Sequence, residues 1–206
     1  SLPHGLLFWR SMTQWIGGLG IVFFTIAVLP IFGVGSVQLF AAEATGPTHD
    51  KVHPRIGVTA KWIWTIYLGL TITEIILLVA GGMNFFDSVC HSLTTTATGG
   101  YSTKQNSIAA FNSPYIEYII TLFMFLAGIN FTLLYLLFLK GNFKRLFQNT
   151  ELHWYLGTVG FFTLFTTVTL IFTSPFSIEE SFRKAIFQVV SLQTTTGSVS
   201  YTHLRA

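Results

Sequence analysis

The sequence predicts an all-α membrane protein in which spans alternate with half-length helices that end in a Thr-Gly loop. Of the 206 residues, 51% are hydrophobic and only 9% are charged, whereas soluble domains carry about a quarter charged residues. The mean hydropathy is +0.60, and the apolar residues form long runs, as membrane spans require. A threonine-rich loop ends at Gly99 and occurs again at Gly197, which indicates an internal repeat.

Four apolar segments are long enough to span a bilayer, because about 20 helical residues at about 1.5 Å each cross its core of about 30 Å. They are approximately Leu6–Phe32, Trp62–Ala80, Ile116–Leu139 and Leu156–Phe176. Two more, approximately Phe85–Thr95 and Phe182–Gln193, reach only about half that distance. We expect these two to be re-entrant helices, because each runs into a threonine stretch and then a glycine.

Basic residues set the expected orientation. Lys51, Arg55 and Lys61 lie between the first two spans, and a second basic group lies between the third and fourth. The positive-inside rule places both loops in the cytoplasm, so both short helices enter from outside. The net charge of +3 is spread along the chain and does not indicate nucleic-acid binding.

The repeated loop has the chemistry of a cation filter. Thr96-Ala97-Thr98-Gly99 corresponds in this interpretation to Thr194-Thr195-Thr196-Gly197, 98 positions later. Backbone carbonyls of a narrow opening can replace the water shell of a cation. A half-helix entering from outside points its negative dipole end toward the membrane centre, which favours a cation over an anion.

Several motifs resemble the Trk/Ktr potassium-uptake family over nearly the whole chain. Gly5–Arg10 with Gln14–Gly18 is similar to the segment after that family's first filter, Thr94–Thr103 to its second filter, and Ser191–Gly197 to its third. The resemblance implies four non-identical repeats around one pore in a bacterial inner membrane. It also implies potassium selectivity, sodium or proton involvement in some members, a homodimer, and a cytoplasmic nucleotide-binding regulatory subunit of the TrkA/KtrA type.

On this resemblance, the carbonyls of both loops bind potassium, and no organic cofactor is expected. The candidate ligands are Ala97, Thr98, Gly99, Thr195, Thr196 and Gly197, with Thr96 and Thr194 as secondary candidates.

The expected organisation follows from these motifs. It comprises the second span of repeat 1 (1–35), a cytoplasmic loop (36–61), repeat 2 (62–140), a second cytoplasmic loop (141–155) and the span, pore helix and filter of repeat 3 (156–197). Residues 198–206 depart from the family pattern, and we expect an artefact of a truncated reading frame there. Since the first filter and fourth repeat are absent and no initiator methionine is present, we expect a fragment that cannot close a pore alone.

Some residues leave two interpretations open. Arg10 is either an interfacial anchor or part of a structural pair in the outer vestibule. Glu74 lies within a predicted span, where a satisfied polar contact is favoured over an ion relay. Gly17, Gly18 and Gly20 allow either tight helix packing or a hinge.

The sequence contains no P-loop, zinc-protease or serine-hydrolase motif, so no catalytic residue is predicted. One cysteine, Cys90, excludes a disulfide within the chain. The favoured function is a potassium-uptake pore subunit. The alternatives are a secondary cation transporter with broken helices and a membrane assembly protein that does not transport.

Overall fold

The computed structural model describes residues 2–28, 56–138 and 149–200. All regular structure within these ranges is helical, which confirms the predicted all-α class for this part of the chain. Most of the two predicted cytoplasmic loops lies outside the described residues. The segments that follow them are already helical at Ile56 and Thr150, so each helix starts earlier than predicted.

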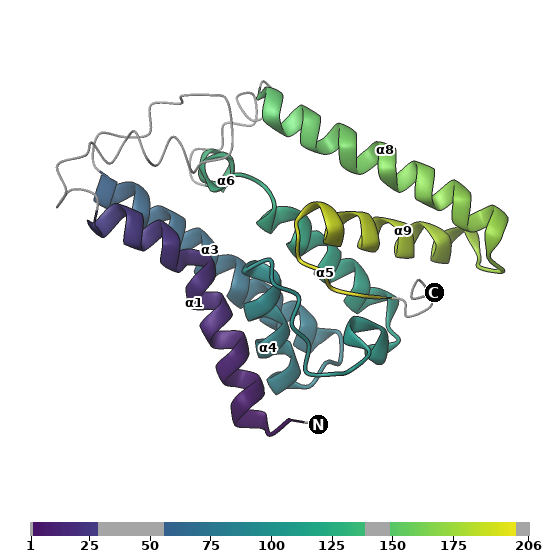
Figure 1. Ribbon diagram of the computed structural model, residues 1–206, viewed down its shortest axis with the longest axis horizontal. Helices are drawn as coiled ribbons and strands as arrows, with labels where there is room; N and C mark the ends of the chain where they lie inside the picture. Colours follow the sequence, from purple (N-terminus) through teal and green to yellow (C-terminus); the bar gives the residue numbers. More distant parts are fainter. Residues whose placement is uncertain (1, 29–55, 139–148, 201–206) are drawn as a thin grey trace.

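The first three helices form one packed group (Figure 1). Helix α1 (His4–Val28) and helix α3 (Ile56–Ala80) run side by side, and the short helix α4 (Phe85–Thr96) contacts both. Helix α4 has 12 residues, about 18 Å, as expected for a half-length helix. Its start is fixed by Asn84, whose side chain accepts a hydrogen bond from the Phe86 amide in the usual manner of an N-cap.

The third predicted span is interrupted, so the prediction of one continuous helix from Ile116 to Leu139 is wrong. Helix α5 (Pro114–Ala127) ends before Gly128, and helix α6 (Phe131–Phe138) follows separately. A Cβ atom on Gly128 would lie 2.5 Å from Thr194 Cγ2 and 2.7 Å from the Tyr155 hydroxyl. Only glycine permits this approach, and glycine also weakens a helix interior by about 1 kcal/mol relative to alanine.

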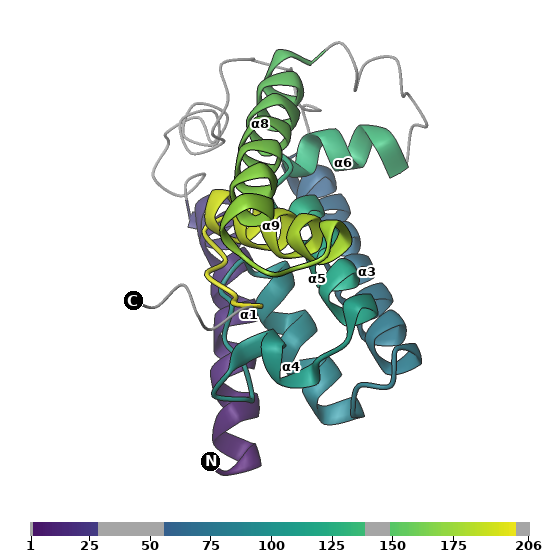
Figure 2. The ribbon, with the colours of Figure 1, turned by 90° about the vertical axis from the view of Figure 1, so that its right-hand side faces the viewer.

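The last two helices form a hairpin beside α5 (Figure 1 and Figure 2). Helix α8 (Thr150–Thr173) turns into helix α9 (Ile178–Gln193), which also packs against α5. Helix α9 starts four residues before the predicted Phe182. Ser177 caps it by accepting from the Glu180 amide, and Glu179 and Glu180 occupy the first turn, where acidic residues suit the helix dipole.

The core lies where α3, α5 and α9 meet. Leu78, Ile120, Met124 and Phe187 are buried in one apolar cluster. A 3₁₀ turn, η2 (Ser107–Phe111), contributes Ile108 to the same cluster. Helix α5 contacts both half-helices, α4 and α9, and so places them relative to each other.

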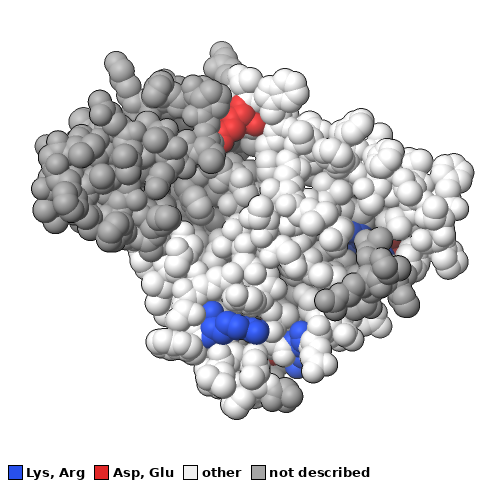
Figure 3. Space-filling model, in the orientation of Figure 1, with Lys and Arg blue, Asp and Glu red and all other residues white. Residues whose placement is uncertain are grey.

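Large apolar side chains are exposed on helix α8. On α8, Trp154 and Phe172 are 72% and 84% exposed, and charged atoms are sparse on the face shown in Figure 3. Within the described residues, Trp62–Ala80 and Thr150–Thr173 are long and apolar enough to cross a membrane. Such exposure of large apolar side chains suits lipid rather than water.

Candidate functional site: two Thr-Gly loops

The site begins where the two half-helices end. Helix α4 is capped at its C-terminus by Ala97 (φ −82°, ψ 3°), and helix α9 is capped by Thr194 (φ −87°, ψ 3°). Each cap leads directly into a Thr-Gly loop. The two loops therefore leave their helices with the same backbone geometry.

Beyond the caps the loops stay alike. Thr98 (φ 51°) and Thr195 (φ 56°) both adopt left-handed backbone angles, as do Gly100 (φ 63°) and Gly197 (φ 71°). A β-branched residue rarely takes this conformation, and such outliers concentrate at functional sites. The conformation recurs in both copies, so it is a property of the repeat.

Side-chain hydrogen bonds show the same correspondence. Thr94 Oγ1 donates to the Tyr101 carbonyl at 2.8 Å, and Ser191 Oγ donates to the Ser198 carbonyl at 2.7 Å. Each bond holds the segment after the loop to the last turn of its half-helix. These segments are thus held by residues that the sequence analysis did not select as site residues.

These matches correct the predicted register. Caps, backbone angles and hydroxyl bonds all correspond at 97 positions rather than 98. Gly100 is therefore the counterpart of Gly197, and Gly99 is the counterpart of Thr196. The alignment of the two loops is set by where each helix ends and by which residues have left-handed backbone angles. The sequence does not reveal either, because two glycines follow Thr98 and either one could match Gly197.

The structure brings the two loops into contact. A Cβ atom on Gly100 would collide with the Thr196 carbonyl oxygen and would lie 2.9 Å from the Ser198 nitrogen. Farther along, the Val199 carbonyl accepts hydrogen bonds from Ile108 and Ala109. All six candidate ligands therefore lie in one pair of touching loops.

The secondary candidates use their hydroxyls inside the helices. Thr96 Oγ1 donates to the Ser92 carbonyl, and Thr194 Oγ1 donates to the Val190 carbonyl, both at 2.8 Å. These hydroxyls stabilise the last helical turns. They are hydrogen-bonded to backbone and hold the start of each loop.

A tyrosine supports the first loop from the neighbouring span. The Tyr67 hydroxyl donates to the Trp15 carbonyl at 3.1 Å. It lies beside Gly18, where an added Cβ would be 2.9 Å from that hydroxyl and 3.1 Å from Ala97 Cβ. Gly18 therefore permits tight packing of α1 against the loop, which resolves the alternatives left open for this glycine.

The second loop has the same support. The Tyr155 hydroxyl donates to the Phe125 carbonyl at 3.1 Å and lies beside Gly128 and Thr194. The contacts of Tyr155, Gly128 and Thr194 thus match those of Tyr67, Gly18 and Ala97. Sequence reasoning missed Gly128, although the only glycine within the third predicted span was a visible signal.

Arg10 connects α1 to the extended segment that follows the first loop. Its guanidinium donates to the Ser102 carbonyl at 2.6 Å and lies 4.7 Å from the centre of the Tyr101 ring. A cation over an aromatic face is attracted to it. Arg10 therefore has a structural contact within the chain, while its pairing in the outer vestibule stays a prediction.

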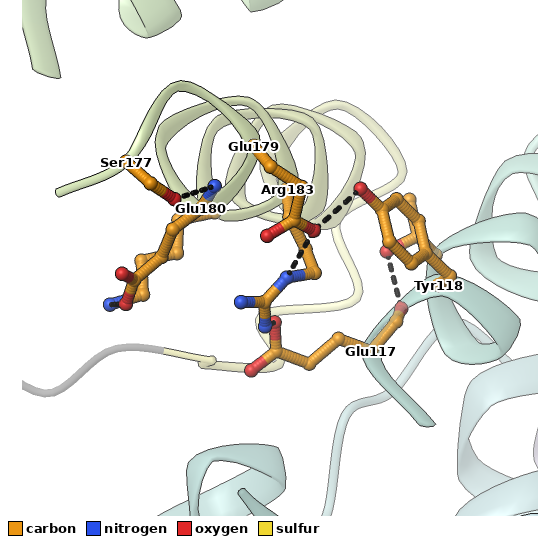
Figure 4. A network of polar contacts seen from close by, with 8 residues as sticks. Glu117, Tyr118, Ser177, Glu179, Glu180 and Arg183 are labelled. Carbon is orange, nitrogen blue, oxygen red and sulfur yellow. Dashed lines mark hydrogen bonds and ion pairs between the residues drawn. The ribbon is translucent and has the colours of Figure 1, made fainter. Parts of the chain in front are cut away.

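A buried ion pair joins α9 to α5 (Figure 4). Arg183 bonds the Glu117 carboxylate and also Glu179 at 3.0 Å, and the Tyr118 hydroxyl donates to Glu179 at 3.1 Å. The hydrogen bond from Arg183 lowers the pKa of the exposed Glu179 carboxyl. The network fixes the N-terminal half of α9, so the C-terminal end of that helix has a defined direction.

These features define an all-helical membrane protein with two supported half-helices and a shared loop site. Residues 1–204 match the family described as "TrkH: Cation transport protein", and the chain belongs to this family. The resemblance found in the sequence is thereby confirmed. The family is one of transporters rather than an enzyme class. Its match extends into the segment expected to leave the family pattern, of which residues 201–206 lie outside the described part.

Curated relatives agree with this assignment. The chain is 41% identical over 199 residues to the Trk system potassium uptake protein TrkH of Escherichia coli K12, covering 96% of this chain and 41% of the relative. It is 33% identical over 198 residues to the Trk system potassium uptake protein TrkG of the same organism, with the same coverage of each. The chain thus spans about two fifths of the length of these relatives.

A solved structure supports the fold. The crystal structure of the potassium transporter TrkH from Vibrio parahaemolyticus matches with a TM-score of 0.80 and 33% identity, over 98% of this chain and 40% of the other. The helical arrangement described above is therefore that of a transporter fold.

Proposed function

We propose that this chain supplies two of the pore loops of a potassium-uptake transporter in a bacterial inner membrane. The observation that carries the proposal is the repetition of one loop geometry in two touching loops, at the C-terminal ends of two half-helices. The named activity of the relatives, potassium uptake, supports the choice of ion.

The candidate ligands are the carbonyls of Ala97, Thr98, Gly99, Thr195, Thr196 and Gly197. A left-handed residue rotates the following peptide plane away from its helical direction, and here one stands in each loop beside the helix end. The negative ends of two helix dipoles lie at the same place. Both features favour a cation, and the corrected register adds the carbonyl of Gly100 as the counterpart of Gly197.

A secondary transporter with broken helices is the alternative. Such folds often carry inverted repeats. Inverted repeats would bring the two loops in from opposite sides, whereas the orientation expected from the basic loops brings both in from outside. The interrupted span at Gly128 is explained by close packing against Thr194 and does not require an alternating-access mechanism.

The wider assembly follows from family membership. We propose a homodimer with a cytoplasmic nucleotide-binding regulatory subunit, with sodium or proton involvement as the resemblance implies. These proposals concern surfaces outside the site described above.

The test is a chimera in which residues 2–200 replace the matching segment of E. coli TrkH. We expect it to restore growth of a potassium-uptake-deficient strain at low potassium and to take up potassium in preference to sodium. The unmodified E. coli protein is the control, and immunoblotting measures the amount in the membrane. A chimera present at the control amount that takes up no potassium, or sodium equally well, contradicts the proposal.

A further inference from the structure

The segment that leaves the first loop is held along one face of α4. Asp87, His91 and Thr94 lie at positions i, i+4 and i+7 of that helix, a spacing that places side chains on one face. Near the start of α4, the Lys104 ammonium lies 3.2 Å from the Asp87 carboxylate. Near its end, Thr94 bonds the Tyr101 carbonyl. The helix and the segment are therefore joined at both ends of their contact.

Ser102 makes the middle contact and joins the segment to two helices. Its hydroxyl oxygen lies 3.4 Å from His91 Nε2 of α4 and accepts a hydrogen bond from the Lys104 amide at 3.0 Å. Its carbonyl accepts the bond from the Arg10 guanidinium of α1 at 2.6 Å. A charged donor makes such a bond stronger than a neutral one. Helices α1 and α4 are thus both connected to the segment through this one serine.

The imidazole that faces Ser102 has a fixed position. The His91 side chain is buried, and its ring meets the Phe111 ring edge to face, with 5.4 Å between the centroids. Within the described residues, the Ser102 hydroxyl is the one hydrogen-bond partner of the His91 ring. Buried polar groups are costly without a partner, so this contact favours a single placement of Ser102.

The placement of Ser102 bears on the loop just before it. Gly100, two residues earlier, has a left-handed backbone and touches the backbone of the second loop. The loop starts at the helix cap formed by Ala97, and the contacts of Ser102 hold the segment at its other end. Carbonyls of a selectivity filter act through their number and position. Fixing both ends of the loop therefore fixes the groups that would face an ion.

The second loop lacks this middle contact. With the loops aligned as above, Gln188 stands where His91 does, and Lys184 stands where Asp87 does. Lys184 pairs with Glu180 of its own helix at 2.6 Å, and no hydrogen bond joins Gln188 to the outgoing segment among the residues described for this part of the chain. The Ser102 contacts therefore belong to the first loop alone of the two.

We propose that Ser102 is a positioning residue for the ion filter: joined to α1 through Arg10 and to α4 through His91, it fixes the end of the Ala97–Gly100 loop and thereby sets its preference for potassium over sodium. This inference rests on the proposed function and names a residue outside the candidate ligands that controls selectivity at one of the two loops.

The experiment measures initial potassium and sodium uptake by the chimera carrying Ser102→Ala. This variant loses both hydroxyl contacts, and the potassium-to-sodium uptake ratio should fall about three- to tenfold, the equivalent of a buried hydrogen bond. Thr103→Val is the matched control in the same segment, because the Thr103 hydroxyl is buried and has no hydrogen-bond partner within the described residues. The control should keep the ratio within about twofold, since it removes no bond.

A double variant tests whether His91 is the partner of Ser102. His91→Phe keeps an aromatic ring against Phe111 and removes the imidazole nitrogen, so it should also lower the ratio. Ser102→Ala combined with His91→Phe should lower the ratio no further than Ser102→Ala alone, because the bond between them is already lost. Losses that multiply in the double variant overturn the inference.

A further variant keeps the inference testable if His91→Phe does not reach the membrane. Arg10→Met removes the bond to the Ser102 carbonyl and should lower the ratio as well. An unchanged ratio in Ser102→Ala or Arg10→Met overturns the inference while leaving the proposed function intact. A fall in Thr103→Val as large as in Ser102→Ala also overturns it, because any change in the segment would then suffice. An unmutated chimera without potassium preference contradicts the proposed function itself.

Discussion

At the scale of single residues, adjacent glycines serve different purposes. Gly100 has a left-handed backbone (φ 63°) and touches the backbone of the other loop. Gly99 is not among the residues with a positive φ, but the side chain of Gln14 fills the space where its Cβ would stand. The main chain requires glycine at position 100, and one flexible side chain requires it at position 99.

This difference predicts that a second substitution, Gln14→Ala, restores one glycine variant and not the other. Gly100→Ala should reduce the potassium-to-sodium uptake ratio of the chimera about tenfold, because a left-handed non-glycine residue costs about 1–2 kcal/mol and the neighbouring backbone cannot withdraw. Gly99→Ala should also lower the ratio, and Gln14→Ala should restore it only in that variant.

The control is Gln14→Ala alone, which we expect to transport potassium. Rescue of Gly100→Ala by Gln14→Ala, or an unaffected Gly100→Ala, would contradict this assignment of roles.

At the scale of elements, the half-helices depend on their neighbours. Helix α9 is held to α5 by the Glu117–Arg183 pair, in which both side chains are largely buried, whereas Glu179 is exposed. Removing one partner of a buried pair leaves an uncompensated charge and typically costs about 3–5 kcal/mol, while replacing both partners is often near neutral. Exposed pairs contribute about 0–1 kcal/mol.

We therefore predict that Arg183→Met strongly lowers the melting temperature of the purified chimera. The double variant Glu117→Leu with Arg183→Met should recover most of the loss, because no buried charge remains. Glu179→Ala is the matched control and should change the melting temperature little. If the double variant is less stable than Arg183→Met, the pair is not the contact that holds α9.

At the scale of the whole molecule, the loops share one site because both half-helices pack on common elements. Helix α5 contacts both α4 and α9, and Val199 bonds the η2 turn, which also contacts α5. In the proposed orientation, both half-helices enter from outside. This orientation predicts which side of the membrane each exposed residue faces.

A cysteine placed at Gln105, an exposed position after the first loop, should react with a membrane-impermeant thiol reagent added to intact cells. A cysteine at Thr150, exposed at the start of α8, should react only after the inner face is opened. The chimera without either substitution gives the background. Labelling of Thr150→Cys but not Gln105→Cys in intact cells would invert the topology.

The sequence by itself determined the class of the protein, because long apolar runs can only be accommodated in a membrane or a large core. It also determined that Phe85–Thr95 and Phe182–Gln193 are short helices ending in polar loops, since length, apolar composition and the following threonines are local properties. The predicted ends were displaced where a cap, such as Ser177, lay beyond the apolar run.

Only the tertiary structure decided the register of the two loops, the break at Gly128 and the burial of Glu74. Each depends on atoms brought together from distant parts of the chain. A glycine, a threonine or an acid has the same local preferences whatever it touches, so its role is fixed by the neighbour that packing places against it.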